Sequence, residues 1–280
     1  MANDGERLPL CVTVIKPTKR WIPVDLKEML RYRELLYFLA WRDIKARYKQ
    51  SILGAGWAII QPLMSMIVFS IFFGRFAKIP SDGNPYPIFV YAGLLPWTFF
   101  ATSVSSSGLS FVSNMNLITK VYFPRILVPI SSLAVALVDF CIAFVIYLGL
   151  MAFYAVVPGW SFFIVPVLMA ATMVAALGAG LALAVLTVRF RDTRAIIPFL
   201  MQLWMFATPV VYPTSIVPER FQWLLALNPM AGVINGFRGA LLNQPIAWDQ
   251  LGISVGISVI LLCASLVYYG RMEREFADVI

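Results

Sequence analysis

Long apolar runs separated by short polar segments dominate the chain. A helix needs about 20 apolar residues to cross about 30 Å of hydrocarbon. Six runs have this character, although serine and threonine interrupt the second. They predict six transmembrane helices, over residues 52–73, 88–112, 126–157, 162–188, 195–212 and 251–270.

The stretch 221–242 does not fit this pattern. It is apolar at both ends, but Asn228, Pro229, Asn235 and Arg238 interrupt it. Broken backbone at membrane depth is tolerated where protein or a water-filled cavity surrounds it. The predicted fold is therefore an all-α polytopic membrane protein with re-entrant outward-side helices between spans five and six, in the region 213–250.

Composition agrees with a membrane protein. Hydrophobic residues make up 60% of the 280 positions and charged residues 13%, and the mean hydropathy is +0.81. These values exclude a soluble enzyme, a disordered chain and a disulfide scaffold. Histidine is absent, and Cys11, Cys141 and Cys263 lack a metal-binding spacing, so no metal site is expected.

The distribution of charge predicts the topology. Residues 1–51 hold eleven of the 22 Lys and Arg, and the segments 113–125, 189–194 and 271–280 hold seven more. The positive-inside rule places these segments, and both termini, in the cytoplasm. The predicted organisation is a cytoplasmic segment 1–51, a six-span domain 52–270 and a cytoplasmic tail 271–280. A seven-span alternative would put the tail outside, against this rule, and no nucleic-acid partner is expected.

One basic, amphipathic helix is predicted over residues 26–49, on the cytoplasmic side at the N-terminal end of the fold. Leu30, Tyr37, Trp41, Ile44 and Tyr48 fall on one stripe, and basic residues flank it. Such a helix would lie in the headgroup plane with its apolar face in the membrane. It is either a membrane anchor alone or also a docking element for a cytoplasmic partner.

The cytoplasmic loop 113–125 mixes polar and apolar residues. Asn116 is placed to cap a short helix that Pro124 ends. Such a helix would fit a groove on a partner protein, whereas the alternative is an ordinary connecting loop. The pattern by itself favours the ordinary loop.

Asp139 is the only formal charge within the six predicted spans. A carboxylate facing lipid near mid-membrane costs about 2.5–3.5 kcal/mol on insertion scales. We therefore predict that Asp139 faces the bundle interior, where it accepts hydrogen bonds from hydroxyls or pairs with an arginine such as Arg238. The alternative is a group that lines a transport path.

Catalytic motifs are missing from the sequence. It contains no GxxxxGK[ST] phosphate loop and no HExxH. The chain is therefore not expected to be an enzyme or to bind a cofactor itself, and a partner is expected to supply the driving chemistry.

Several segments together resemble the permease subunits of polysaccharide ABC exporters, in the O-antigen, capsule and teichoic-acid group of type-2 ABC exporters. The similarity runs from about residue 26 to the last span. The segments are WRDIKARYK (41–49), LGAGWAIIQP (53–62), YAGLLPW (91–97), LITKVYFPR (117–125), VRFRD (188–192), ATPVVYP (207–213) and LNPM (227–230).

This resemblance implies a homodimer of six-span subunits in the bacterial inner membrane, with two separate ATP-binding cassette subunits that hold ATP and Mg. The complex would move lipid-linked polysaccharide, often on undecaprenyl diphosphate, to the outer leaflet. The implied roles are coupling to the ATPase for Asn116, Leu117, Ile118, Lys120, Tyr122 and Arg125, an interface helix with Trp41, Arg42, Lys45 and Tyr48, and an outward gate with Pro209, Pro213, Asn228 and Pro229.

A channel for a sugar polymer needs hydroxyls and aromatic rings along its wall. Spans two and five carry both kinds of side chain, although the same residues also suit helix packing and interfacial belts. The competing functions are a small-lipid or drug ABC exporter, a secondary carrier or channel, and a membrane enzyme of lipid-linked sugar metabolism. The candidate lining residues are Tyr91, Trp97, Phe99, Phe100, Ser103, Ser106, Trp204 and Tyr212.

Overall fold

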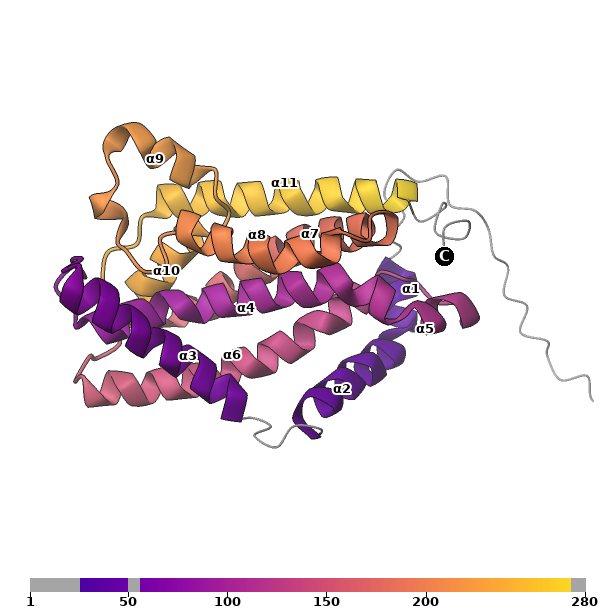
Figure 1. Ribbon diagram of the computed structural model, residues 1–280, viewed down its shortest axis with the longest axis horizontal. Helices are drawn as coiled ribbons and strands as arrows, with labels where there is room; N and C mark the ends of the chain where they lie inside the picture. Colours follow the sequence, from indigo (N-terminus) through magenta and orange to yellow (C-terminus); the bar gives the residue numbers. More distant parts are fainter. Residues whose placement is uncertain (1–25, 50–55, 273–280) are drawn as a thin grey trace, which may run out of the picture.

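A computed structural model describes residues 26–49 and 56–272 of the chain (Figure 1). All regular elements in these residues are helices, which confirms the predicted all-α class. Five helices are long and apolar enough to cross a membrane, so this is a multi-pass membrane protein. They are α3 (Gly56–Phe69) with its π-helical continuation η1 (Ser70–Phe76), α4 (Tyr86–Ser113), α6 (Leu127–Phe153), α7 (Val165–Arg189) with the preceding 3-10 turn η2 (Trp160–Ile164), and α11 (Trp248–Met272).

Shorter helices gather at the two ends of this bundle (Figure 1). The helices α1 (Leu26–Arg31) and α5 (Met115–Lys120) lie at one end, and α2 (Arg33–Lys49) runs from there along the bundle. At the other end lie α9 (Glu219–Ala226) and α10 (Ala231–Leu241), near the short turn η3 (Thr214–Ile216). The predicted cytoplasmic residues 1–25 and 273–280, and the start of the first predicted span, lie outside the described residues.

The fifth predicted span, 195–212, is shorter than expected. The helix α8 (Thr193–Ala207) has 15 residues, which at about 1.5 Å per residue cover roughly 22 Å. It ends because Thr208 precedes Pro209 and takes an extended conformation, with φ −105° and ψ 141°. The described residues therefore contain five candidate spans and one shorter apolar helix.

The helix α4 forms the centre of the bundle. It packs against α3, α6, α7, α8 and α10, and side chains on all of its faces are buried. The other helices instead expose apolar side chains on their outer faces, such as Met64 on α3, Phe199 on α8 and Ile260 on α11. This arrangement suits a bundle with one helix enclosed by protein and its neighbours in contact with lipid.

Small residues bring α7 close to α4 and α11. A Cβ atom built on Gly178 would lie 2.9 Å from the backbone nitrogen of Leu262, and one on Gly180 would lie 2.6 Å from Cβ of Ser107. The hydroxyl of Ser265 on α11 donates a hydrogen bond to the carbonyl of Gly178 (2.7 Å). Close backbone approach with hydroxyl hydrogen bonds is typical of helix packing in membranes.

We expect Gly178→Ala to lower the thermal unfolding temperature of the purified protein in detergent. The new methyl group overpacks the contact with α11, and overpacking costs about 1–3 kcal/mol. Gly149→Ala on α6 is the matched control, because no atom lies within 4 Å of its Cβ position. Equal unfolding temperatures for the two variants would contradict a tight α7–α11 contact.

Candidate functional site

Asn114 forms the junction between α4 and the short helix α5. Its backbone carbonyl accepts hydrogen bonds from the amides of Leu117 (3.0 Å) and Ile118 (3.1 Å), and these bonds start α5. Its side-chain amide donates to the carbonyl of Ser110 in the last turn of α4 (3.0 Å). The predicted short helix exists, but Asn114 rather than Asn116 precedes it, and it ends at Lys120, ahead of Pro124.

The helix α5 has one packed and one exposed side. Ile118 is buried in an apolar cluster that includes Leu39 of α2, Phe111 of α4 and Leu127 of α6. The opposite side presents exposed side chains. The helix α5 lies at one end of the bundle (Figure 1). Of the predicted coupling residues, Asn116, Lys120 and Tyr122 are exposed, whereas Leu117 and Arg125 are half-buried.

The predicted basic helix 26–49 is present as α1 and α2. The two helices are continuous except at Tyr32, whose amide still bonds to the carbonyl of Glu28 (3.1 Å). The predicted apolar stripe does not face the protein along most of its length, because Leu30, Tyr37 and Trp41 are exposed.

A different face of α2, which includes Leu39, packs against α6. Trp41 stacks on Tyr37 with ring centroids 6.4 Å apart, and the ammonium of Lys45 lies 5.2 Å from the Trp41 ring centroid. Aromatic rings beside a cation are typical of a surface at headgroup level.

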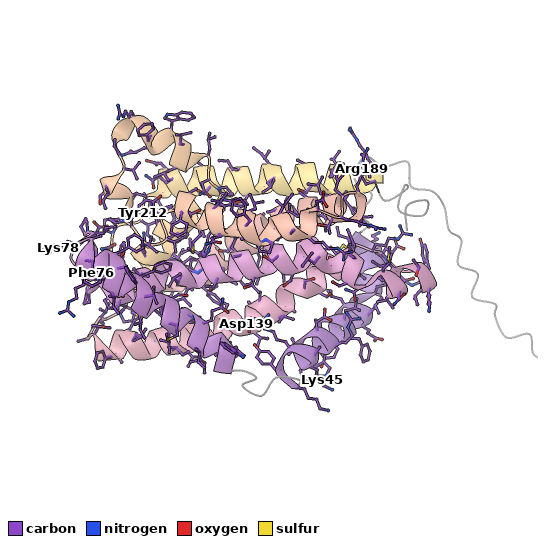
Figure 2. The ribbon with its side chains drawn as sticks, viewed as in Figure 1. Lys45, Phe76, Lys78, Asp139, Arg189 and Tyr212 are labelled. Carbon is purple, nitrogen blue, oxygen red and sulfur yellow. The ribbon has the colours of Figure 1, made fainter. Side chains whose placement is uncertain are left out.

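Asp139 joins the end of α2 to the middle of α6 (Figure 2). One of its oxygens pairs with the guanidinium of Arg47 (2.7 Å), and the other accepts a hydrogen bond from the hydroxyl of Tyr48 (2.5 Å). Burial raises the pKa of Tyr48 and the hydrogen bond to Asp139 adds to the shift, so the phenol stays protonated and able to donate. The carboxylate is 17% exposed, as expected for a side chain that faces protein.

The prediction that Asp139 could pair with Arg238 is wrong. Arg238 lies on α10 at the opposite end of the bundle and is 3% exposed. Its guanidinium donates hydrogen bonds to the carbonyls of Val210 (2.6 Å) and Tyr212 (3.1 Å), and it stacks over Phe89, 3.9 Å from the ring centroid. It therefore holds the segment of turns and bends that follows α8. A lone arginine within the apolar stretch 231–242 was the sequence signal for this role.

Asn228 organises the neighbouring turn and connects α8 to α10. Its side-chain oxygen accepts hydrogen bonds from the indole of Trp204 (3.2 Å) and the amide of Met230 (3.0 Å), and its amide donates to the hydroxyl of Thr208 (2.8 Å). The structure thus brings a predicted gate residue, Asn228, together with a predicted lining residue, Trp204. Of the other predicted gate residues, Pro209, Pro213 and Pro229 are buried nearby.

The candidate lining residues divide into two groups. Ser106, Trp204 and Tyr212 are partly exposed. The others are buried in the core of the chain, so a solute would reach them only after helices separate. These buried residues are Tyr91, Trp97, Phe99, Phe100 and Ser103.

Comparison with known proteins identifies the family. Residues 34–242 match the ABC-2 type transporter family. The O-antigen export system permease protein RfbA of Myxococcus xanthus is 33% identical over 258 residues, which cover 90% of this chain and 98% of that protein. A Klebsiella pneumoniae protein of the same name is 26% identical, covering 92% of this chain and 99% of its own length. The polysialic acid transport protein KpsM of Escherichia coli is 23% identical, with 83% and 91% covered. The chain belongs to the ABC-2 type transporter family.

Proposed function

We propose that this chain is the transmembrane subunit of an ATP-driven exporter that moves lipid-linked polysaccharide from the cytoplasmic to the outer leaflet of the bacterial inner membrane. The observation that carries this proposal is the similarity to an O-antigen export permease over 98% of that protein's length. A relative named for polysialic acid transport supports the same substrate class. The glycan is proposed to travel on a carrier of the undecaprenyl diphosphate type.

ATP and Mg belong to a separate subunit in this proposal, because the sequence has no phosphate-binding loop. The exposed side of α5 is the proposed contact for that subunit, together with the basic helix α2. Two copies of the chain with two ATP-binding subunits would form the working complex. ATP-driven closure of the partners would then shift the population of helix arrangements in the membrane.

The helix α8 completes a sixth crossing in this proposal. It starts at the end of the bundle where α7 stops with Arg189, and the segment after Ala207 continues toward α9 and α10 (Figures 1 and 2). Arg189, Arg191 and Arg194 at that turn favour the cytoplasmic side. Both chain ends are then cytoplasmic, and α9 and α10 face outward.

The proposed function is tested by deleting the gene and by isolating the complex. We expect lipid-linked polysaccharide to accumulate inside the deletion strain, and the chain to co-purify with an ATP-binding subunit. The purified chain alone should hydrolyse no ATP. Accumulation of a small lipid without polysaccharide would instead indicate a lipid exporter, and ATP turnover by the lone chain would contradict a separate ATPase.

The exposed side of α5 gives a second prediction. The pair Lys120→Glu and Val121→Asp changes exposed side chains, so the protein should fold normally while co-purification with the ATP-binding subunit and surface polysaccharide are lost. Ile118→Asp is the contrasting variant. It places a charge in the buried cluster and should lower the yield of folded protein. Normal export by the Lys120/Val121 double variant would indicate an ordinary loop.

The outward segment after α8 gives a third prediction. Arg238→Met leaves the carbonyls of Val210 and Tyr212 without their donor, and each unsatisfied buried group costs about 1–3 kcal/mol. We expect a lower unfolding temperature and reduced export. Arg220→Met on α9 is the control, because Arg220 is exposed. An Arg238→Met protein as stable as this control would show that the segment does not depend on Arg238.

A further inference from the structure

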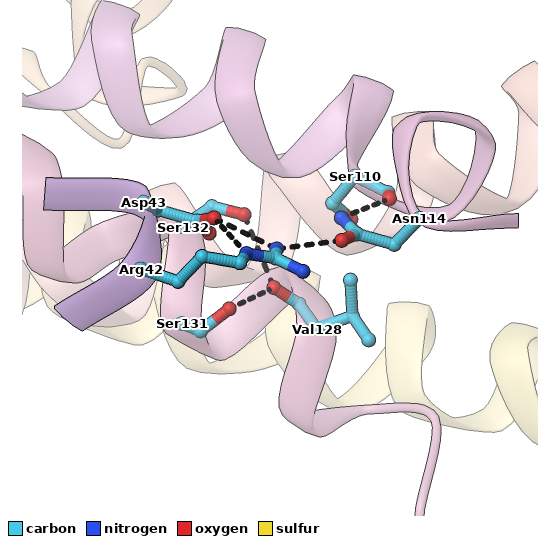
Figure 3. A network of polar contacts seen from close by, with 7 residues as sticks. All are labelled: Arg42, Asp43, Ser110, Asn114, Val128, Ser131 and Ser132. Atoms are coloured by element: carbon cyan, nitrogen blue, oxygen red, sulfur yellow. Dashed lines mark hydrogen bonds and ion pairs between the residues drawn. The ribbon is translucent and has the colours of Figure 1, made fainter. Parts of the chain in front are cut away.

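A hydrogen bond between side chains 72 positions apart joins α2 to the start of α5. The guanidinium nitrogen Nη2 of Arg42 donates to the side-chain oxygen of Asn114 at 2.6 Å (Figure 3). Arg42 lies in the middle of α2, and Asn114 is the single residue between α4 and α5. The bond therefore connects the two cytoplasmic elements that are proposed to face the ATP-binding subunit.

Asp43 holds the Arg42 guanidinium in position. One carboxylate oxygen of Asp43 accepts hydrogen bonds from Nε (2.9 Å) and Nη2 (2.7 Å) of Arg42. The Arg42 side chain is 48% exposed, so solvent screens this pair and its contribution to stability is small. Its importance is geometric, because two bonds to one oxygen limit rotation of the guanidinium and keep Nη2 directed at Asn114.

Asn114 has hydrogen bonds to three helices, α2, α4 and α5. Its amide nitrogen bonds to the carbonyl of Ser110 on α4, its side-chain oxygen bonds to Arg42, and its backbone carbonyl starts α5. Because the nitrogen needs an acceptor and the oxygen a donor, both neighbours fix the same orientation of the amide.

The first turn of α6 lies beside this network (Figure 3). The carbonyl of Val128 there accepts hydrogen bonds from the hydroxyls of Ser131 (2.8 Å) and Ser132 (3.1 Å). The last turn of α2 is also bonded to α6, through Asp139. The helix α2 thus has polar bonds to both the α4–α5 junction and the middle of α6.

We propose that Arg42 and Asn114 form a tie through which α2 and α5 respond as one unit to the ATP-binding subunit, and that Arg42 is a positioning residue for transport. This inference rests on the proposed function. Without the tie, a displacement of α5 would be absorbed at the α4–α5 junction, and a displacement of α2 would reach α6 alone. ATP hydrolysis would then continue with less export.

A double-mutant cycle tests the tie. Arg42→Ala, Asn114→Ala and their combination are expressed with the ATP-binding subunit in a deletion strain. Surface polysaccharide is measured per complex in the membrane, and MgATP hydrolysis and the unfolding temperature are measured on the purified complex. We expect each single variant to lower export at least about fivefold, which is the smallest factor typical of coupling between two sites. The rate of ATP hydrolysis should stay within about twofold of that of the unaltered complex. The combined variant should export no less than either single one, because both remove the same bond.

Two further variants separate a tie from general damage. Arg33→Ala removes an exposed charge from α2 without touching the junction. In a variant that combines Arg33→Ala with Asn114→Ala, the two export losses should multiply, because the residues share no bond. Asn114→Asp keeps an oxygen acceptor for Arg42 and should restore export above the level of Asn114→Ala.

Some results would overturn the tie. If the export losses of Arg42→Ala and Asn114→Ala multiply in the combined variant, the two residues act independently and there is no tie. A fall in ATP hydrolysis or unfolding temperature that accounts for the whole export loss would show a structural role only. An unaltered complex that restores no surface polysaccharide would overturn the proposed function and this inference with it.

Discussion

The close approach of α7 to α4 and α11 sets the spacing of the whole bundle. In lipid, helices gain no hydrophobic energy from meeting one another, so their association depends on close packing and hydrogen bonds. Gly178 and Gly180 provide the close packing, and Ser265 provides a hydrogen bond to backbone. Because α7 is held in this way, α4 is enclosed on all sides, and both groups of short helices can attach to its ends.

Polar side chains mark the places where these short helices attach. At one end, Arg238 satisfies two carbonyls of the segment after α8, and Asn228 joins the next turn to Trp204. At the other, Arg42 and Asp139 connect α2 to the α4–α5 junction and to α6. A buried polar group with its partners in place specifies one arrangement, because an unpaired group in a low-dielectric interior is costly.

The sequence allowed a prediction of features that depend on one segment at a time. Run length predicted six spanning helices, of which five are long enough to span, and Pro209 explains why α8 is shorter than its apolar run. Features that depend on two distant segments were not predictable. Spacing identified the exposed stripe on α2, but it did not predict that another face, which includes Leu39, packs against α6. Asp139 was expected to face protein, yet its partners come from α2, about 90 positions earlier.

The position of Asp139 has a consequence for the surrounding bilayer. Arg47 and Tyr48 bond to a carboxylate near the middle of α6, so the basic end of α2 lies beside the middle of α6 rather than at its end. Arg47 is 43% exposed on its side chain, and a cation there requires water or lipid phosphate within its reach. On the proposed topology, polar groups of water or lipid therefore reach as far as the middle of α6 on the side that carries α2.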